Sequence, residues 1–165
     1  MKKIEKIIFN DFIKLNKEKT FFNKINKILQ KEIGFILLTF TVKHPQKKLV
    51  QRIYSSNNKV YPVGGTKKIP RNYFSEVTFK KRKSFIGNNV KEIQKYHYDH
   101  KIITNLGAEA ILNQVVIFDN KTIGTINLLN IANHFNNNHL GITNLISKFL
   151  APIYLKHQIR MKKKH

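Results

Sequence analysis

The chain of 165 residues contains no cysteine. This absence excludes disulfide bonds, zinc sites built from thiolates and catalysis by a cysteine nucleophile. A chain without cysteine also suits the reducing cytosol, where disulfides rarely form. With 41% hydrophobic residues the chain can build a real core. We therefore expect a folded cytoplasmic protein.

Long apolar segments are also lacking. Glu5 and Asp11 interrupt the basic N-terminal stretch where a secretory signal would need an apolar region. No apolar run approaches the ~18 residues that suggest a membrane span. The longest run, residues 33–42, is more typical of a buried strand.

Acidic residues and arginine are scarce. The chain has 9 Asp and Glu against 31 Lys and Arg, which gives a net charge of +22. Such a charge favours nucleic acid or an anionic membrane as partner. The four arginines are Arg52, Arg71, Arg82 and Arg160, whereas specific nucleic-acid readers usually depend on Arg. Abundant Lys, Asn, Ile and Phe also fit A/T-rich coding, so two explanations of the charge stay open, and nucleic acid is not the expected partner.

Hydrophobic periodicity of 3.6 or 2 residues divides the first two thirds of the chain into helices and strands. Thr20 is placed to cap the second helix, and Gly107 to end the last one. The predicted segments are helices over 2–15 and 20–33, strands over 34–42 and 49–55, a loop over 57–65, a short helix with a basic end over 70–83, a short strand over 84–88 and a helix over 89–106.

The clearest element is a hairpin, with strands over 110–118 and 122–129 around a compact turn at 119–121. Its nearly continuous hydrophobicity is typical of central strands. A helix over 140–161 follows, which Pro152 should kink or interrupt. This order predicts an α+β fold with a central antiparallel sheet and helices on both sides. We expect one domain over 1–165, with a helical segment over 1–31, the sheet and pocket over 33–131 and a terminal helix over 139–161.

Several stretches resemble stand-alone bacterial GAF-domain proteins. They are Tyr54-Ser55-Ser56, the segment 61–67, the segment 85–88, Asp99-His100, Leu106-Gly107 and the segment 123–129, which matches a strand phrase of the form glycine, any residue, hydrophobic, Asn, hydrophobic, hydrophobic. The resemblance covers about residues 21–155. It implies a GAF-like central antiparallel sheet of five or six strands, flanking helices and a pocket for a small molecule.

The same resemblance limits the chemistry. GAF-type methionine sulfoxide reductases need cysteines and phytochromes attach their pigment through one, so neither chemistry carries over. No residue set of cyclic-nucleotide-binding GAF domains is recognisable. What remains is a sensory, signal-transducing domain without catalytic activity, in line with the lack of any acid–base pair among the nine carboxylates.

By this resemblance the pocket is roofed by residues 61–67 and 96–100 and floored by the hairpin. The candidate ligand-binding residues are Tyr61, Gly64, Gly65, Lys67, Tyr96, Asp99, His100 and Asn113. Lys67 near the roof favours a small anionic or zwitterionic metabolite as ligand.

Three motifs in this set have alternative interpretations. The Gly64-Gly65 turn lacks a complete phosphate-loop motif, so it either needs positive φ or turns backbone N–H groups and Lys67 toward an anion. His97 and His100 would share one side of a helix, but no third metal ligand is evident, and no metal or cofactor is predicted. Asn113 and Asn127 either bond to each other across the hairpin, or Asn113 reads a polar ligand group.

The predicted first helix has no place in a minimal GAF domain. Together with the terminal helix it could form a helical homodimer bundle. The alternative is that this basic helix lies on an anionic membrane surface with its apolar face down.

Overall fold

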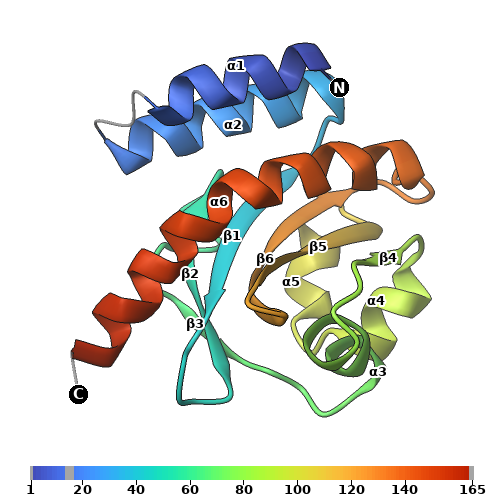
Figure 1. The fold of residues 1–165 in the computed structure, drawn as a ribbon. Coiled ribbons are helices and arrows are strands. Elements are labelled where there is room, and N and C mark those ends of the chain that lie inside the picture. The colour runs from blue at the N-terminus through green and yellow to red at the C-terminus, as the bar shows by residue number, and fades with distance from the viewer. Residues whose placement is uncertain (1, 14–16, 164–165) are drawn as a thin grey trace.

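The computed structural model describes residues 2–13 and 17–163, and its centre is a six-stranded antiparallel sheet with helices on both faces (Figure 1). The strand order is β3-β2-β1-β6-β5-β4. The elements are α1 (Lys2–Ile13), α2 (Glu18–Glu32), β1 (Leu37–Lys43), β2 (Leu49–Ser55), β3 (Thr66–Lys68), α3 (Tyr73–Ser75), the π-helical turn η1 (Glu76–Lys80), β4 (Phe85–Gly87), α4 (Val90–Tyr96), α5 (His100–Asn105), β5 (Ala110–Phe118), β6 (Lys121–Asn130) and α6 (Asn137–Lys163).

One face of the sheet is covered by α6 and, beside it, by α2, whose Phe22 packs on Phe40 of β1 and Tyr54 of β2 (Figure 1). α1 packs on both of these helices. Leu38, Phe40 and Leu128 point to this side and are fully buried against Ile146 and Leu150 of α6. This is the larger hydrophobic core. We call this side of the sheet the helix face.

The N-terminal helices join this core through aromatic rings. The ring of Phe12 lies 5.7 Å from that of Phe21 in α2 and 5.9 Å from that of Phe149 in α6. In turn, Phe22 packs edge-on against Phe40 of β1. The helical segment that precedes the sheet is therefore part of the packed structure.

The opposite face is covered by the shorter elements α3, η1, α4 and α5 (Figure 1). Phe74, Phe85, Ile93 and Ile103 form a second, smaller core there, together with Leu37 and other residues at one end of the strands. This side of the sheet, which we call the pocket face, holds the candidate site.

The structure confirms the predicted α+β class, the central antiparallel sheet and the hairpin at its centre. β5 and β6 pair from Ala110↔Asn130 to Phe118↔Lys121. Asp119 and Asn120 turn the chain with φ of 48° and 53°. These positive values suit a two-residue hairpin turn, and Asp and Asn tolerate them better than most residues.

Several predicted boundaries were wrong. α2 begins at Glu18 with Lys17 as its N-cap, so Thr20 lies inside the helix and does not cap it. The predicted end of the first helix at Leu15 lies outside the described residues. The predicted helix over 89–106 is two helices, because the backbone of His97 is extended. α6 continues without interruption through Pro152.

Two short elements were not predicted. β3 is a three-residue edge strand of polar residues, so it has no hydrophobic alternation to reveal it. Part of the predicted short helix is the π-helical turn Glu76–Lys80, a form with no distinct sequence pattern that is frequent at functional sites.

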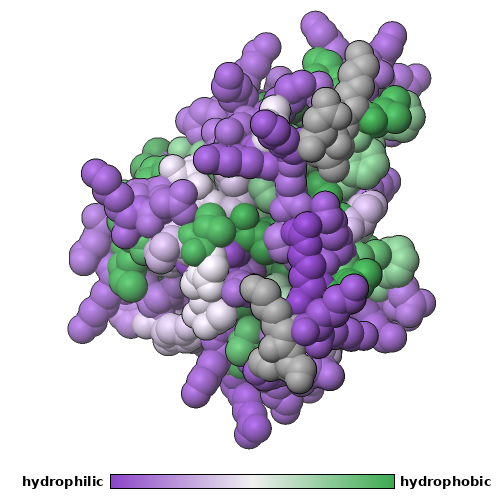
Figure 2. All heavy atoms as spheres, turned by 90° about the vertical axis from the view of Figure 1, so that its left-hand side faces the viewer, coloured by the Kyte–Doolittle hydropathy of each residue, from purple (hydrophilic) through white to green (hydrophobic). Residues whose placement is uncertain are grey.

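Hydrophilic side chains cover most of the molecular surface on the side of β3 and the end of α6, and hydrophobic ones form scattered groups there (Figure 2). Among the helices of the described ranges, none combines the length and hydrophobicity required to cross a bilayer.

Candidate functional site: a polar pocket on one face of the sheet

A cavity of about 90 Å³ lies between the pocket face and the segments that cover it. This is several times the ~10–15 Å³ that one water molecule requires. Its wall consists of Leu37, Thr39, Thr41, Val50, Arg52, Tyr61, Lys67, Lys68, Ile69, Pro70, Phe74, Phe79, His97, Asp99, Ile103, Ile111, Asn113, Thr125, Asn127 and Leu129.

The floor changes from apolar to polar along the strands. Because strand side chains alternate between faces, every second residue of β1, β6 and β5 faces the cavity. Register places Leu37, Leu129 and Ile111 in the first row. Thr39, Asn127 and Asn113 form the second row, and Thr41 and Thr125 lie in the third.

Hydrogen bonds connect the polar rows. Asn113 donates its amide N–H to Asn127 Oδ1 at 2.7 Å, and Asn127 donates to Thr39 Oγ1 at 3.1 Å. Thr41 and Thr125 share a hydroxyl hydrogen bond of 2.7 Å. The amide and hydroxyl orientations on the floor are therefore fixed before any ligand arrives.

A β-bulge turns Arg52 toward the cavity. Phe40 pairs with Tyr54, but the next residue, Thr41, pairs with Arg52, so one extra residue stands in β2. Ile53 and Tyr54 consequently both pack into the helix-face core, and Arg52 faces the pocket. Bulges commonly redirect a side chain beside a binding site in this way.

Arg52 is held in place by the loop that precedes β3. Its Nη1 donates to the carbonyl oxygen of Pro62 at 2.8 Å, and its guanidinium lies 4.7 Å from the centre of the Tyr61 ring. A Cβ on Gly65 would lie 2.8 Å from Nη1, so a larger residue there would displace the guanidinium from this position.

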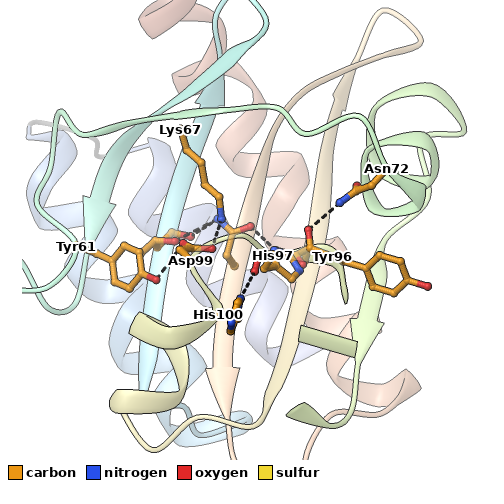
Figure 3. A network of polar contacts seen from close by, with 10 residues as sticks. Tyr61, Lys67, Asn72, Tyr96, His97, Asp99 and His100 are labelled. Carbon is orange, nitrogen blue, oxygen red and sulfur yellow. Dashed lines mark hydrogen bonds and ion pairs between the residues drawn. The ribbon is translucent and has the colours of Figure 1, made fainter. Parts of the chain in front are cut away.

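An ion pair joins the two parts of the roof (Figure 3). Lys67 Nζ of β3 lies 2.6 Å from Asp99 Oδ1, and the Tyr61 hydroxyl donates to Asp99 Oδ2 at 3.1 Å. Burial alone would raise the pKa of Asp99, but attraction to Lys67 and these two hydrogen bonds outweigh it and lower the pKa. Burial and the nearby Asp99 raise the pKa of Tyr61, which keeps the phenol protonated as a donor.

His97 occupies the break between α4 and α5 (Figure 3). The residue is 4% exposed, and its ring packs against Phe74, with 4.7 Å between ring centres, and against Phe85. Burial, and secondarily the charge of Lys67, lower the pKa of His97 to about 4. The imidazole is therefore neutral at physiological pH and able to donate from one nitrogen and accept at the other.

Three residues of the pocket wall each carry a buried polar atom that lacks a partner. Within residues 2–13 and 17–163, the buried side-chain atoms without a hydrogen bond include Arg52 Nε, His97 Nε2 and Asn113 Oδ1. Buried polar groups are normally satisfied, because each one left unpaired costs about 1–3 kcal/mol. Three such atoms on residues of one cavity wall leave hydrogen-bonding capacity that the described residues do not fill.

No protein-family model matches the chain, and no curated protein matches it by sequence. Solved structures do match its fold. The GAF domain of a phosphoenolpyruvate-protein phosphotransferase from Coxiella burnetii superposes with a TM-score of 0.75 at 13% identity, over 99% of this chain and 96% of that one. The phycocyanobilin-bound GAF domain of a cyanobacterial phytochrome gives a TM-score of 0.72 at 12% identity, over 96% of each chain. This chain has a GAF fold.

Enzymes share this fold too. A type II free methionine-R-sulfoxide reductase from Thermoplasma acidophilum superposes on 79% of the chain with 14% identity and a TM-score of 0.63, and the match spans 86% of the reductase. Most of the matched structures are GAF domains of other proteins.

The GAF fold brings four of the eight predicted ligand-binding residues to the cavity. Tyr61, Lys67, Asp99 and Asn113 line it. They come from the loop before β3, β3 itself, the α4–α5 junction and β5, so the fold gathers them from four separate places.

The other four predicted residues lie outside the wall. The N–H groups of Gly64 and Gly65 donate to the carbonyl oxygens of Arg52 and Pro62, so they are not directed at an anion. The Tyr96 ring packs on Tyr73 and Phe85, while its carbonyl accepts from Asn72 Nδ2 at 2.9 Å (Figure 3).

The metal-binding interpretation of His97 and His100, which was not the prediction, has no support in the structure. His97 has an extended backbone after the end of α4, and His100 begins α5, so the two residues do not lie on one helix. His100 Nδ1 instead lies 3.2 Å from the carbonyl oxygen of His97. No group of three His, Cys, Asp or Glu side chains that could hold a metal ion occurs among the described residues.

The sequence analysis did not predict Arg52 and His97 as residues of the cavity wall. Strict alternation in β2 puts Arg52 on the side of Tyr54, and only the bulge separates them. The sequence pattern placed His97 on one continuous helix, where metal binding was the interpretation considered for it. The helix breaks after Tyr96 because the His97 ring packs against Phe74, a tertiary contact that local pattern does not reveal. Thr39, Thr41 and Thr125 were hidden in apolar strands, although polar residues in such strands are a usable signal.

Proposed function

We propose that this GAF-fold chain is a cytoplasmic sensory domain that binds a small anionic or zwitterionic metabolite and does not catalyse a reaction. The observation that carries the proposal is that three residues of one cavity wall, Arg52, His97 and Asn113, each have a buried polar atom without a partner. A ligand that satisfied them would stabilise the folded chain.

The charges of the wall support this ligand class. Arg52 and Lys67 are cationic, Asp99 is anionic and His97 is neutral, so an anionic group is favoured at the Arg52 end of the cavity. A carboxylate matches the fork of an arginine. The Asn113 carbonyl oxygen accepts, so it would suit an N–H or ammonium group of the same molecule.

The wall also supports an apolar part. Leu37, Ile111 and Leu129 face the cavity at the end opposite to the third polar row, and Phe74 and Ile103 also line it. The ligand class is therefore a compact carboxylate with a polar group next to it and a short apolar tail.

A non-catalytic role is supported by the chain's lack of cysteine, which the reductase chemistry of this fold requires. Asp99 is the carboxylate of the cavity wall, and its oxygens are engaged by Lys67 and Tyr61. Asp99, with both oxygens bound by Lys67 and Tyr61, holds the roof segments together and does not act as an acid or base.

A thermal-shift screen of amino acids and short carboxylic acids tests the proposal. A ligand at 100 times its dissociation constant stabilises the fold by about 2.7 kcal/mol. Arg52→Met or Asn113→Ala should weaken binding about 10-fold or more, since each removes a buried hydrogen-bonding group. Asn26→Ala is the matched control, because its buried amide oxygen also lacks a partner but lies in α2, away from the cavity. If no compound stabilises the chain, or if Asn26→Ala weakens binding equally, the pocket proposal is wrong.

The same proposal includes a homodimer through the terminal helices. α1 packs on α6, and Ile7, Phe9 and Ile13 of α1 remain exposed. Light scattering should give twice the chain mass, and Phe9→Ser with Ile13→Ser should return it to the monomer. A monomeric wild type at micromolar concentration would exclude this assembly.

A further inference from the structure

The tip of the β5–β6 hairpin carries exposed apolar side chains. The first seven residues of β5 are buried, but Ile117 is 43% and Phe118 is 50% exposed. The Asp119-Asn120 turn follows them at once. The strand thus leaves the core before it ends, and its last two large side chains face solvent.

Basic residues flank this tip on one side. The segment Lys80-Lys81-Arg82-Lys83 is held next to the hairpin, because Thr122 donates to the Thr78 carbonyl oxygen at 2.7 Å. Just after the segment, Ser84 Oγ accepts from the backbone N–H of Val115 at 3.3 Å.

Basic residues also lie on the other side. Val42 pairs with Gly124, so Lys43 ends β1 at the same end of the sheet as the hairpin turn (Figure 1). Gln158 of α6 donates to the Lys43 carbonyl oxygen at 2.7 Å, which places the start of the basic run Arg160, Lys162 and Lys163 nearby. We call the set of Ile117, Phe118, Lys121, Lys43 and residues 80–83 the basic tip.

The charge of the basic tip is largely uncompensated. Two of the nine carboxylates lie in its segments or directly beside them, Glu76 and Asp119, and each is paired with a lysine of the tip, Lys80 and Lys121. Lys81 and Lys83 form no ion pair with a described carboxylate. A protruding apolar pair therefore stands among cations.

We propose that the basic tip docks the protein on an anionic lipid surface. Each Lys or Arg near such a surface contributes about 1 kcal/mol of attraction, and Ile117 and Phe118 can enter the boundary between headgroups and acyl chains. Lysine stems add to this, because they bury apolar carbons while the ammonium stays among phosphates. A nucleic acid fits less well, since single-strand binders stack several bases on aromatic rings, and aliphatic Ile117 offers no such platform. This surface is independent of the ligand pocket.

The full chain contains no tryptophan, so Phe118→Trp creates a single fluorescent reporter at the tip. With vesicles of phosphatidylcholine containing 30% phosphatidylserine, its emission should shift to the blue, and with pure phosphatidylcholine it should not. Ile131→Trp is the matched control, because Ile131 is 58% exposed and follows the end of β6 that lies opposite the hairpin turn. A shift for Ile131→Trp and none for Phe118→Trp would overturn the proposal, because lipid would then contact the other end of the sheet.

Charge-reversal variants distinguish docking through the basic tip from attraction by the net charge of the whole chain. Lys81→Glu with Lys83→Glu should lower vesicle affinity at least 10-fold, at about five-fold for each positive charge removed. Lys27→Glu with Lys31→Glu changes the net charge equally but lies on α2, and should lower affinity by less than three-fold. Equal losses would show that net charge alone drives binding. If the chain binds RNA or DNA at 150 mM salt and ignores the vesicles, the surface is a nucleic-acid site and the proposal is wrong.

Discussion

The two faces of the sheet use the same strands for different purposes. On β1, Leu38 and Phe40 lie on the helix face and are fully buried among apolar side chains. Thr39 and Thr41 lie on the pocket face and form hydrogen bonds. Burial of apolar area stabilises the first face, while the second keeps polar atoms in a fixed array around a cavity. Because neighbouring residues belong to opposite faces, a substitution on one strand can be directed at either face.

The largest effect is expected on the helix face. Ile126→Ala removes a fully buried side chain and should lower the free energy of unfolding by about 4 kcal/mol. Its neighbour Thr125→Val, on the pocket face, removes one hydroxyl hydrogen bond and should cost only about 1 kcal/mol. Urea unfolding of both variants measures the contrast, and equal losses would mean that the faces do not divide stability in this way.

A pH effect should come from the pocket face. The pKa of His97 is about 4 in the fold against an ordinary value of 6.5, so between these values the unfolded chain binds the additional proton. Stability therefore falls as pH drops from 6.5 to 4, by about 3 kcal/mol for this group. His97→Phe should remove this part of the slope, and His100→Gln should leave it. Chemical unfolding between pH 4 and 7 supplies the test, and an unchanged slope in His97→Phe would refute it.

A smaller loss is expected where α6 meets the sheet. A Cβ at Gly124 would lie 2.2 Å from the Thr41 carbonyl oxygen and 2.6 Å from the Tyr154 ring. Gly124→Ala should therefore cost about 2 kcal/mol, because β6 must move away from both β1 and α6. Gly107→Ala is the control, because its φ of +78° is strained but nothing lies within 4 Å of the new Cβ, and it should cost about 1 kcal/mol. The order of the two unfolding midpoints decides between packing and backbone strain.

The smallest effect should come from the roof ion pair. Lys67 and Asp99 side chains are 25% and 11% exposed, so water screens the pair only in part. A double-mutant cycle with Lys67→Met and Asp99→Asn should give a coupling of about 1 kcal/mol. A coupling near zero in 0.1 M salt would mean that the roof is closed by packing alone.

Sequence reasoning succeeded where one local pattern decides the structure. Hydrophobic periodicity predicted the hairpin strands β5 and β6, the strand β2 and the helices α1, α2 and α6. Their order predicted the fold class. Part of the candidate site followed too, since Tyr61, Lys67, Asp99 and Asn113 lie at the cavity.

The rest depends on interactions that are distant in sequence. The bulge that redirects Arg52 exists only in the pairing of β1 with β2. The break that buries His97 requires the rings of Phe74 and Phe85 from other elements. No window of a dozen residues contains either cause.

The contact between Tyr154 and Thr125 connects α6 with the floor of the cavity. The Tyr154 hydroxyl of α6 donates to the Thr125 carbonyl oxygen at 3.0 Å, while the Thr125 side chain stands on the cavity floor. Thr125 thus connects the cavity floor directly with α6, the longest of the described helices. Any displacement of Thr125 would reach the middle of α6, whose last turn carries Arg160, Lys162 and Lys163.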